Sequence, residues 1–346
     1  MYPYTMRFLV RPNLLYYIHH HGHGHFSRFS LLAKELQKSF ELTVVCCSRT
    51  IEEKLNDSFN VVRLEDKWNS ILGDPCFSPI ERTPYSFGAQ ARSDQFTKLI
   101  RNKSKMLFLS DYSMELSLIA RLSGVPTVIF KQHGHYLNDP LSKITIDSAE
   151  LLIAPFPNLE EFNPWEDKTI YTGFFSRYSP EQKMLDNFKD VTIIPGSSSE
   201  LSDSIETLAI SNPSRVFTVI GIKDFQSKAK NVVSLGRVKS IKEYLNTKIV
   251  ITAAGNNSIA EILSLGINPI IVPEERPFKE QLHKAELLEK QNLAVKTSTL
   301  ELKTTFEKVL AKSKKLDSVN TIKHCNKQAP KLIRESLVET YERVYE

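Results

Sequence analysis

The sequence lacks any uninterrupted apolar run of about 18 residues, so we expect no membrane-spanning helix. Residues 1–12 also lack the apolar core and the small-residue cleavage site of a secretory signal. Cysteine is scarce, and its spacing fits no metal site. Two of the cysteines are adjacent in an apparent buried strand, which suits reduced thiols and a cytoplasmic protein. The four cysteines are Cys46, Cys47, Cys76 and Cys325.

A strong charge of one sign is also missing. The formal net charge is +5 in 346 residues, and the basic residues are spread out apart from a lysine-rich run near Lys308–Lys315. Such a run is typical of a solvated helix face, so we expect no nucleic-acid partner. The run is also compatible with peripheral contact at the inner face of an anionic membrane.

Short apolar, β-branched runs alternate with amphipathic helical patterns along the whole chain. This alternation is typical of parallel sheets covered by helices on both faces. We therefore expect an α/β protein of two Rossmann-like domains facing across a cleft, with ligands near the carboxyl ends of the strands. The expected strands are 14–19, 42–46, 106–109, 127–130 and 151–154, then 191–194, 216–220, 231–234, 249–252, 269–272 and 293–295.

A proline-rich stretch separates the two series of expected strands. It places an N-terminal domain at residues 1–160, a linker at 161–180 and a C-terminal domain at 181–327. Residues 328–346 return to a helical pattern. We expect this last helix to pack back on the N-terminal domain.

The first expected strand leads into a loop rich in histidine and glycine, from His19 to Arg28. Gly22 and Gly24 permit unusual backbone angles there, and the start of the helix behind them suits an anion. Ser27 is a suitable N-cap residue for that helix. The third glycine of the dinucleotide fingerprint is missing, which disfavours dinucleotide binding.

His25 is the candidate general base in this loop. Imidazole has a pKa of about 6.5 and can accept a proton from an acceptor hydroxyl at neutral pH. The alternative is that His25 only caps or orients the loop. Five histidines lie between His19 and His25. Neighbouring histidines on a strand point to opposite faces, and no cysteine or carboxylate cluster accompanies them, so a metal site is disfavoured.

A second glycine turn follows an expected strand in the C-terminal half, and a helix begins after it near Ser258. The backbone N–H groups of such a turn can bind a pyrophosphate, assisted by Asn and Ser side chains. Glu261, one turn into the helix, can accept hydrogen bonds from both hydroxyls of a ribose. The alternative for Glu261 is an ordinary carboxylate near a helix N-terminus. The turn consists of Gly255, Asn256, Asn257 and Ser258.

The run AGNNSIAEILSLGINPIIVP, followed by Glu280-Gln281 and Lys284-Ala285, resembles the donor-domain signature of the family 28 glycosyltransferases. That family has the GT-B fold and includes the enzyme that adds N-acetylglucosamine to form lipid II. The turn at residues 195–199 resembles the family's phosphate loop, and Gly24-His25 with Arg28 resembles its N-terminal loop. Residues 110–135 resemble the acceptor domain of relatives.

The resemblance implies a nucleotide-sugar donor, with uridine diphosphate as the carrier, and no further cofactor. Glu261 would bind the ribose, and Gln281 would contact the sugar. The sequence departs from the family pattern at two positions, with Pro195 in place of a glycine and Glu280 in place of a frequent histidine. These departures leave the identity of the donated sugar undetermined. The diphosphate would lie over Gly255–Ser258 and over Gly196, Ser197 and Ser198.

On the acceptor side, the resemblance implies a glycan or lipid-linked acceptor and a role in cell-envelope or surface glycan synthesis. Asp111 could orient a histidine, bind an acceptor hydroxyl or cap a helix. Arg28 or His23 would assist the leaving diphosphate. The acceptor-side residues are Gly24, Arg28, Asp111 and His133.

The predicted reaction is transfer of a hexosyl group with inversion and without a metal ion. No DxD-type motif is present, so helix N-termini and hydroxyl groups would stabilise the leaving diphosphate. Two alternatives stay open. One is a nucleotide-sugar hydrolase of the nonulosonic-acid type, and the other is a non-catalytic nucleotide-sugar-binding subunit.

Overall fold

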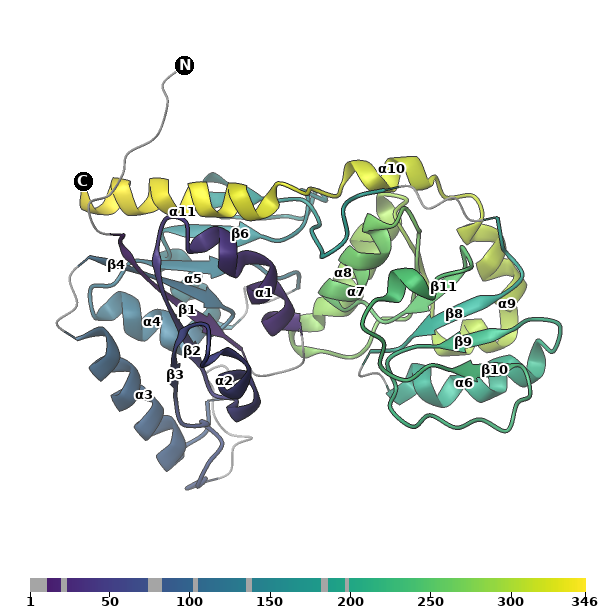
Figure 1. The fold of residues 1–346 in the computed structure, drawn as a ribbon, viewed down its shortest axis with the longest axis horizontal. Coiled ribbons are helices and arrows are strands. Elements are labelled where there is room, and N and C mark those ends of the chain that lie inside the picture. The colour runs from purple at the N-terminus through teal and green to yellow at the C-terminus, as the bar shows by residue number, and fades with distance from the viewer. Residues whose placement is uncertain are drawn as a thin grey trace, which may run out of the picture.

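The computed structural model describes residues 11–19, 24–73, 83–101, 105–134, 139–181, 186–196 and 199–346. These residues form two parallel β-sheets, of seven and six strands, each flanked by helices (Figure 1). This arrangement confirms the predicted α/β architecture with two Rossmann-like units.

The first sheet has the strand order β3-β2-β1-β4-β5-β6-β7, and every neighbouring pair is parallel. Strand β1 lies between β2 and β4, so Ile18 pairs with both Cys46 and Asp111 at the carboxyl edge. The strands are β1 (Asn13–Ile18), β2 (Glu41–Cys46), β3 (Asn60–Arg63), β4 (Met106–Asp111), β5 (Thr127–Phe130), β6 (Leu151–Ala154) and β7 (Thr169–Tyr171).

Helices cover both faces of the first sheet, which explains why β1 is apolar without interruption. On β1, Leu14, Tyr16 and Ile18 pack on the face covered by α1, α2 and α11. Leu15 and Tyr17 pack on the opposite face, against α3 and α4. The helices of this unit are α1 (Gly24–Leu36), α2 (Arg49–Leu55), α3 (Phe87–Ile100), α4 (Met114–Leu122), α5 (Pro140–Ser148) and the 3₁₀ helix η3 (Glu166–Lys168).

The second sheet has the order β10-β9-β8-β11-β12-β13, again with parallel neighbours. One face packs against α6 and α9, and the other packs against α7 and α8. Its strands are β8 (Val191–Ile194), β9 (Phe217–Val219), β10 (Val232–Ser234), β11 (Val250–Thr252), β12 (Ile270–Ile271) and β13 (Val295–Lys296).

Local signals define the helices of the second unit. Ser298 and Glu301 form a reciprocal capping box at the start of α9. Gly266, with φ of +67°, terminates α7 in the left-handed region that glycine adopts freely. The helices are α6 (Ser199–Ser211), η4 (Ile241–Glu243), α7 (Asn256–Ser264), η5 (Pro277–Lys279), α8 (Glu280–Lys290), α9 (Thr299–Ser313), α10 (Ser318–Lys323) and α11 (Ala329–Tyr345).

The segment predicted as a linker, residues 161–180, is partly built into the first sheet. Strand β7 lies within it and pairs with β6, so the first unit extends to Tyr171 and the linker prediction was too long. The reason is that β7 is a three-residue edge strand with half-buried side chains, which gives a weak apolar pattern.

The chain crosses between the two sheets twice, and the two crossing segments are hydrogen-bonded to each other. The Phe174 N–H donates to the His324 carbonyl at 2.9 Å, and the Asn326 N–H donates to the Phe174 carbonyl at 2.7 Å. Gly173 permits this approach, because a Cβ there would lie 2.9 Å from Asn326 Cβ. After the second crossing, α11 runs across the first unit, where Ile333 and its apolar neighbours join the core (Figure 1).

Candidate active site

Helix α1 presents the candidate base at its first turn. The helix begins at Gly24, so His25 is its second residue and Ser27 lies inside it. The prediction that Ser27 is the N-cap was therefore wrong, because the helix starts four residues before Arg28, which would be its first residue if Ser27 were the N-cap. His23 and Gly22 lie outside the described residues.

His25 and Arg28 converge on one buried carboxylate. Asp111, the last residue of β4, is fully buried. Its Oδ1 lies 2.9 Å from His25 Nδ1 and also accepts a hydrogen bond from the Arg28 guanidinium. Arg28 in turn stacks over the Phe130 ring, with 4.9 Å between Cζ and the ring centroid. Helix α1 and strand β4 thus bring together three of the predicted residues.

The electrostatics of this trio keep Asp111 ionised. Burial alone would raise the pKa of Asp111, but the Arg28 guanidinium and His25 together lower that pKa below its usual value. Asp111 Oδ1 faces His25 Nδ1 at 2.9 Å. With the proton on Nδ1, the other ring nitrogen, Nε2, would be the proton acceptor.

Asp111 was also considered as a helix cap, and the structure excludes that role. The N-cap of α4 is Ser113, two residues further along the chain. Asp111 instead ends its strand directly beside β1, which carries the histidine loop at its carboxyl end. This position lets its side chain reach α1.

The predicted diphosphate-binding turn forms the start of α7. Gly255 is the N-cap, and the helix begins at Asn256, two residues earlier than predicted, so the Asn257 and Ser258 N–H groups belong to its first turn. The Asn257 side chain donates to the Gly24 carbonyl at 3.2 Å. The N-terminal ends of α1 and α7 are therefore in contact, although α1 packs on the first sheet and α7 packs on the second.

Gly196 belongs to the neighbouring loop of the second sheet. It follows β8 with φ of +66°, and no atom lies within 4 Å of where its Cβ would be. Strands β8 and β11 are paired, with Ile194 opposite Thr252. The loops after both strands thus share one edge of the sheet. Ser197 and Ser198 lie outside the described residues.

Glu261, the predicted ribose ligand, lies on α7 and is held by Arg177 from the crossing segment. The Arg177 guanidinium contacts both carboxylate oxygens, at 2.9 and 3.2 Å, and also donates to the Lys239 carbonyl. Burial raises the pKa of Glu261, and Arg177 opposes that rise. Arg177 was not among the predicted residues.

Gln281, the predicted sugar contact, lies in the first turn of α8 and is buried. Its side-chain oxygen accepts hydrogen bonds from the Ala254 N–H at 3.1 Å and the Glu274 N–H at 3.0 Å. Its amide nitrogen donates to Glu274 at 3.1 Å. Gln281 therefore joins the loop before α8 to the turn before α7.

His133 lies in a buried ionic cluster rather than on an open acceptor surface. Its Nδ1 is 3.1 Å from Glu161 Oε2, and its ring stacks on Phe156 at 3.8 Å. Lys131 Nζ lies 2.8 Å from the same Glu161 oxygen, and His283 Nε2 of α8 lies 3.0 Å from Oε1. Glu161 thus connects the end of β5 to the second unit, and His133 is buried in this connection.

Acidification is expected to destabilise the protein through His133. Burial lowers the pKa of His133 to about 4, although the Glu161 hydrogen bond favours the protonated form. In the unfolded chain the pKa is about 6.5, so the unfolded state binds the extra proton first as the pH falls. The unfolding free energy should decrease by about 2.4 kcal/mol between pH 7 and 4.5 from this group. Unfolding midpoints of wild type and His133→Asn check this, since Asn retains a donor but does not titrate. An equal pH dependence in both proteins would contradict the assignment.

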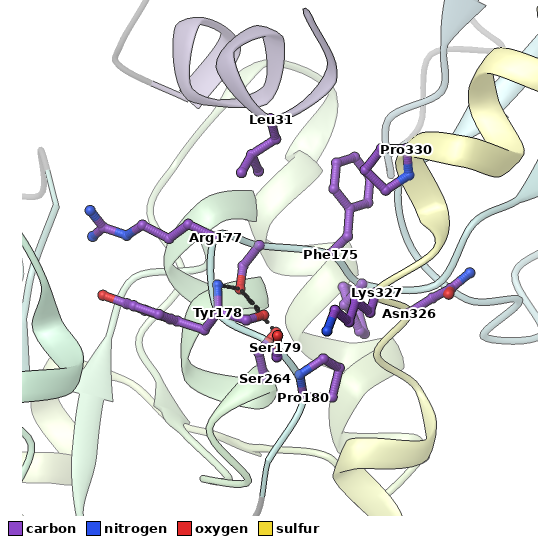
Figure 2. A pocket seen from close by; sticks show the side chains of 12 residues that line it. Leu31, Phe175, Arg177, Tyr178, Ser179, Pro180, Ser264, Asn326, Lys327 and Pro330 are labelled. Carbon is purple, nitrogen blue, oxygen red and sulfur yellow. Dashed lines mark hydrogen bonds between the residues drawn. The ribbon is translucent and has the colours of Figure 1, made fainter. Parts of the chain in front are cut away.

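One pocket, of about 240 Å³, lies where the chain crosses between the sheets (Figure 2). Leu31 of α1, residues 174–180 and the start of α11 line it, and the Ser176 hydroxyl lies 3.0 Å from that of Ser264. Ser264 ends α7, whereas the diphosphate turn begins that helix, about 12 Å away at 1.5 Å per residue. This pocket is therefore distant from the predicted diphosphate turn, while Arg177, which lines it, contacts Glu261.

Within the described part of the chain, no group of three or more His, Cys, Asp or Glu side chains converges closely enough to hold a metal ion. Among the helices of the same residues, none combines the length and the apolar character needed to cross a membrane.

The two parallel sheets with their flanking helices have the GT-B fold of known glycosyltransferase structures. MurG of Acinetobacter baumannii superposes with a TM-score of 0.70 at 14% identity, over 95% of this chain and 100% of that one. A UDP-glucosyltransferase from Polygonum tinctorium capable of glucosylating indoxyl gives 0.65 at 12%, over 96% and 99%. The spinosyn rhamnosyltransferase SpnG, complexed with thymidine diphosphate, gives 0.62 at 14%, over 94% and 99%.

The C-terminal half also resembles a known family in sequence. Residues 194–336 match the glycosyltransferase family 28 C-terminal domain, a segment that includes Gly255–Ser258, Glu261 and Gln281. The predicted resemblance is thus confirmed: the chain has the GT-B fold, and this segment matches the C-terminal domain of family 28. GT-B glycosyltransferases use nucleotide-sugar donors. No curated protein sequence matches the chain.

Proposed function

We propose that the protein transfers a sugar from a nucleotide-sugar to an acceptor hydroxyl, with His25 as the general base. The observation that supports this most directly is the His25–Asp111 pair at the start of α1, beside the start of α7. A histidine oriented by an ionised carboxylate is a typical base, and a helix start is a typical diphosphate site. His25 and the start of α7 lie next to each other, although they belong to different units of the fold.

In the proposed reaction, His25 Nε2 takes the proton of the acceptor hydroxyl. The acceptor oxygen then attacks the anomeric carbon, and the bond from that carbon to the diphosphate oxygen breaks. The nucleoside diphosphate leaves with the electron pair, stabilised by the N–H groups at the start of α7 and by the Asn257 and Ser258 side chains. Direct attack of this kind inverts the anomeric centre. Asp111 stabilises the imidazolium that forms.

A donor screen followed by turnover measurements tests the proposal. A nucleotide-sugar that binds the folded state raises the unfolding midpoint, so thermal shifts across nucleotide-sugars identify the donor. Release of nucleoside diphosphate should then depend on an added hydroxyl acceptor. Full turnover without an acceptor would assign the site to hydrolysis, and tight binding without turnover under either condition would indicate a binding subunit.

Replacing Glu261 with alanine is expected to weaken nucleoside binding. A carboxylate that accepts hydrogen bonds from ribose hydroxyls contributes about 1.5–3 kcal/mol, so the Kd should rise about 10- to 100-fold. Calorimetric titration with uridine diphosphate and with its 2′,3′-dideoxy analogue measures this. Glu307→Ala, an exposed carboxylate on α9 paired with Arg215, is the matched control. If wild type binds both ligands equally well, the ribose role of Glu261 is wrong.

A further inference from the structure

Lys284 is a buried cation that the proposed reaction does not use. It lies on α8 with 1% of its side chain exposed. Its ammonium group donates to the Ala254 carbonyl at 2.8 Å and to the Glu280 carboxylate. Lysine is almost never fully buried unless it is paired, because removing an ammonium group from water is costly. Its position therefore calls for a specific explanation.

Lys284 and Gln281 together hold the residue that precedes the diphosphate turn. They lie three positions apart on α8 and so share one helix face. Gln281 accepts from the Ala254 N–H, and Lys284 donates to the Ala254 carbonyl. Both polar backbone groups of Ala254 are thus bound by α8. Because Ala254 directly precedes Gly255, the N-cap of α7, these contacts fix where the turn begins.

The charge of Lys284 lies behind the same turn. Burial lowers the pKa of this ammonium group, the Glu280 carboxylate raises it, and the Arg28 guanidinium is close enough to lower it further. Lys284 and Arg28 therefore place two cations near the junction of α1 and α7. In a buried setting a charge acts over several ångströms with little screening, so a diphosphate at the start of α7 would be attracted to it.

We propose that Lys284 is a positioning residue for the donor diphosphate: it holds the backbone before α7 in place and supplies positive potential beneath the turn. Glu280 tunes that potential by partly neutralising the ammonium group. This inference rests on the proposed function, because it assumes that the diphosphate binds at Gly255–Ser258.

The first test is Lys284→Met, which keeps the length of the side chain and removes its charge. Titrations with uridine diphosphate and with uridine separate the charge effect from the nucleoside contacts. We expect the Kd for uridine diphosphate to rise about tenfold or more, and the Kd for uridine to change little. Lys290→Met, an exposed lysine on the same helix, carries the same change in charge and should leave both Kd values unchanged.

The second test is Glu280→Gln, which should change the affinity for uridine diphosphate in the opposite direction. Removing this carboxylate leaves the Lys284 charge less neutralised, so binding of uridine diphosphate should become about threefold tighter, with a steeper dependence on salt. A purely structural role for the pair would weaken binding in both variants, and that result would overturn the proposal. Equal losses for uridine and uridine diphosphate in Lys284→Met would also overturn it. If wild type binds no nucleoside diphosphate at all, the proposed function itself fails.

Discussion

Replacing His25 with alanine is expected to lower kcat about 10²–10⁴-fold, the usual contribution of a positioned general base. The affinity for the nucleotide-sugar should stay nearly unchanged, because His25 lies on α1 in the first unit and the proposed donor contacts lie at the start of α7 in the second unit. Steady-state kinetics with the donor found in the screen, together with donor titrations, measure both quantities.

His324→Ala is a suitable control for this experiment. The His324 side chain is half-buried, and the residue is the C-cap of α10, where the second crossing segment begins. It has no part in the proposed reaction, so its replacement should leave kcat within about twofold, which corresponds to under 0.5 kcal/mol. If His25→Ala retains the wild-type kcat, His25 is not the base, and its contact with Asp111 only orients the loop.

Replacing Glu161 with glutamine is expected to lower the unfolding free energy by about 3–5 kcal/mol, because it removes one partner from a buried ionic cluster. Glu161 has only 8% of its side chain exposed and contacts Lys131, His133 and His283. Burial alone would raise the pKa of Glu161, but hydrogen bonds from both histidines hold that pKa far below its usual range. Glutamine preserves the shape and loses the charge that these contacts need. Urea unfolding at pH 7 measures the loss.

The adjacent residue offers a matched comparison. Glu160 has 69% of its side chain exposed and pairs only with Lys290, at 3.0 Å. Exposed pairs contribute about 0–1 kcal/mol, so Glu160→Gln should shift the unfolding midpoint very little. Similar losses in both variants would show that the buried cluster adds nothing to stability beyond an ordinary surface pair.

The fold and the core of the site could be predicted because their signals are local. The central strands are continuous apolar runs, since helices cover both of their faces. The turn at Gly255–Ser258 follows such a strand and precedes a helix. This strand–turn–helix order can be predicted from neighbouring residues. Asp111 could be placed at the end of a strand for the same reason.

The elements that were missed have weaker local signals. Strands β3 and β7 lie at the two edges of the first sheet, so each has one neighbouring strand and half-buried or exposed side chains. Their short sequences, NVVR and TIY, resemble loop segments with a few β-branched residues. An edge strand is specified by its neighbour more than by its own pattern.

The partners of the predicted residues could not be found from sequence for a different reason. Arg177 reaches Glu261 across 84 positions, and Glu161 reaches His283 across more than 100. No spacing rule connects residues that meet only when the two sheets come together. The assignment of His133 to the acceptor side failed in the same way, because its burial depends on Phe156 and Glu161 and not on the strand that carries it.

The return of α11 to the first sheet has a consequence for the order of assembly. Topologically, residues 191–323 are an insertion in the first unit, since they lie between β7 and the helix that completes its core. The second unit is continuous in sequence and can acquire its core as soon as it is synthesised. In the first unit, α1 and α2 cover only part of the same apolar face until Ile333, Leu337 and Tyr341 emerge, so the half that carries His25 is the last to be completed.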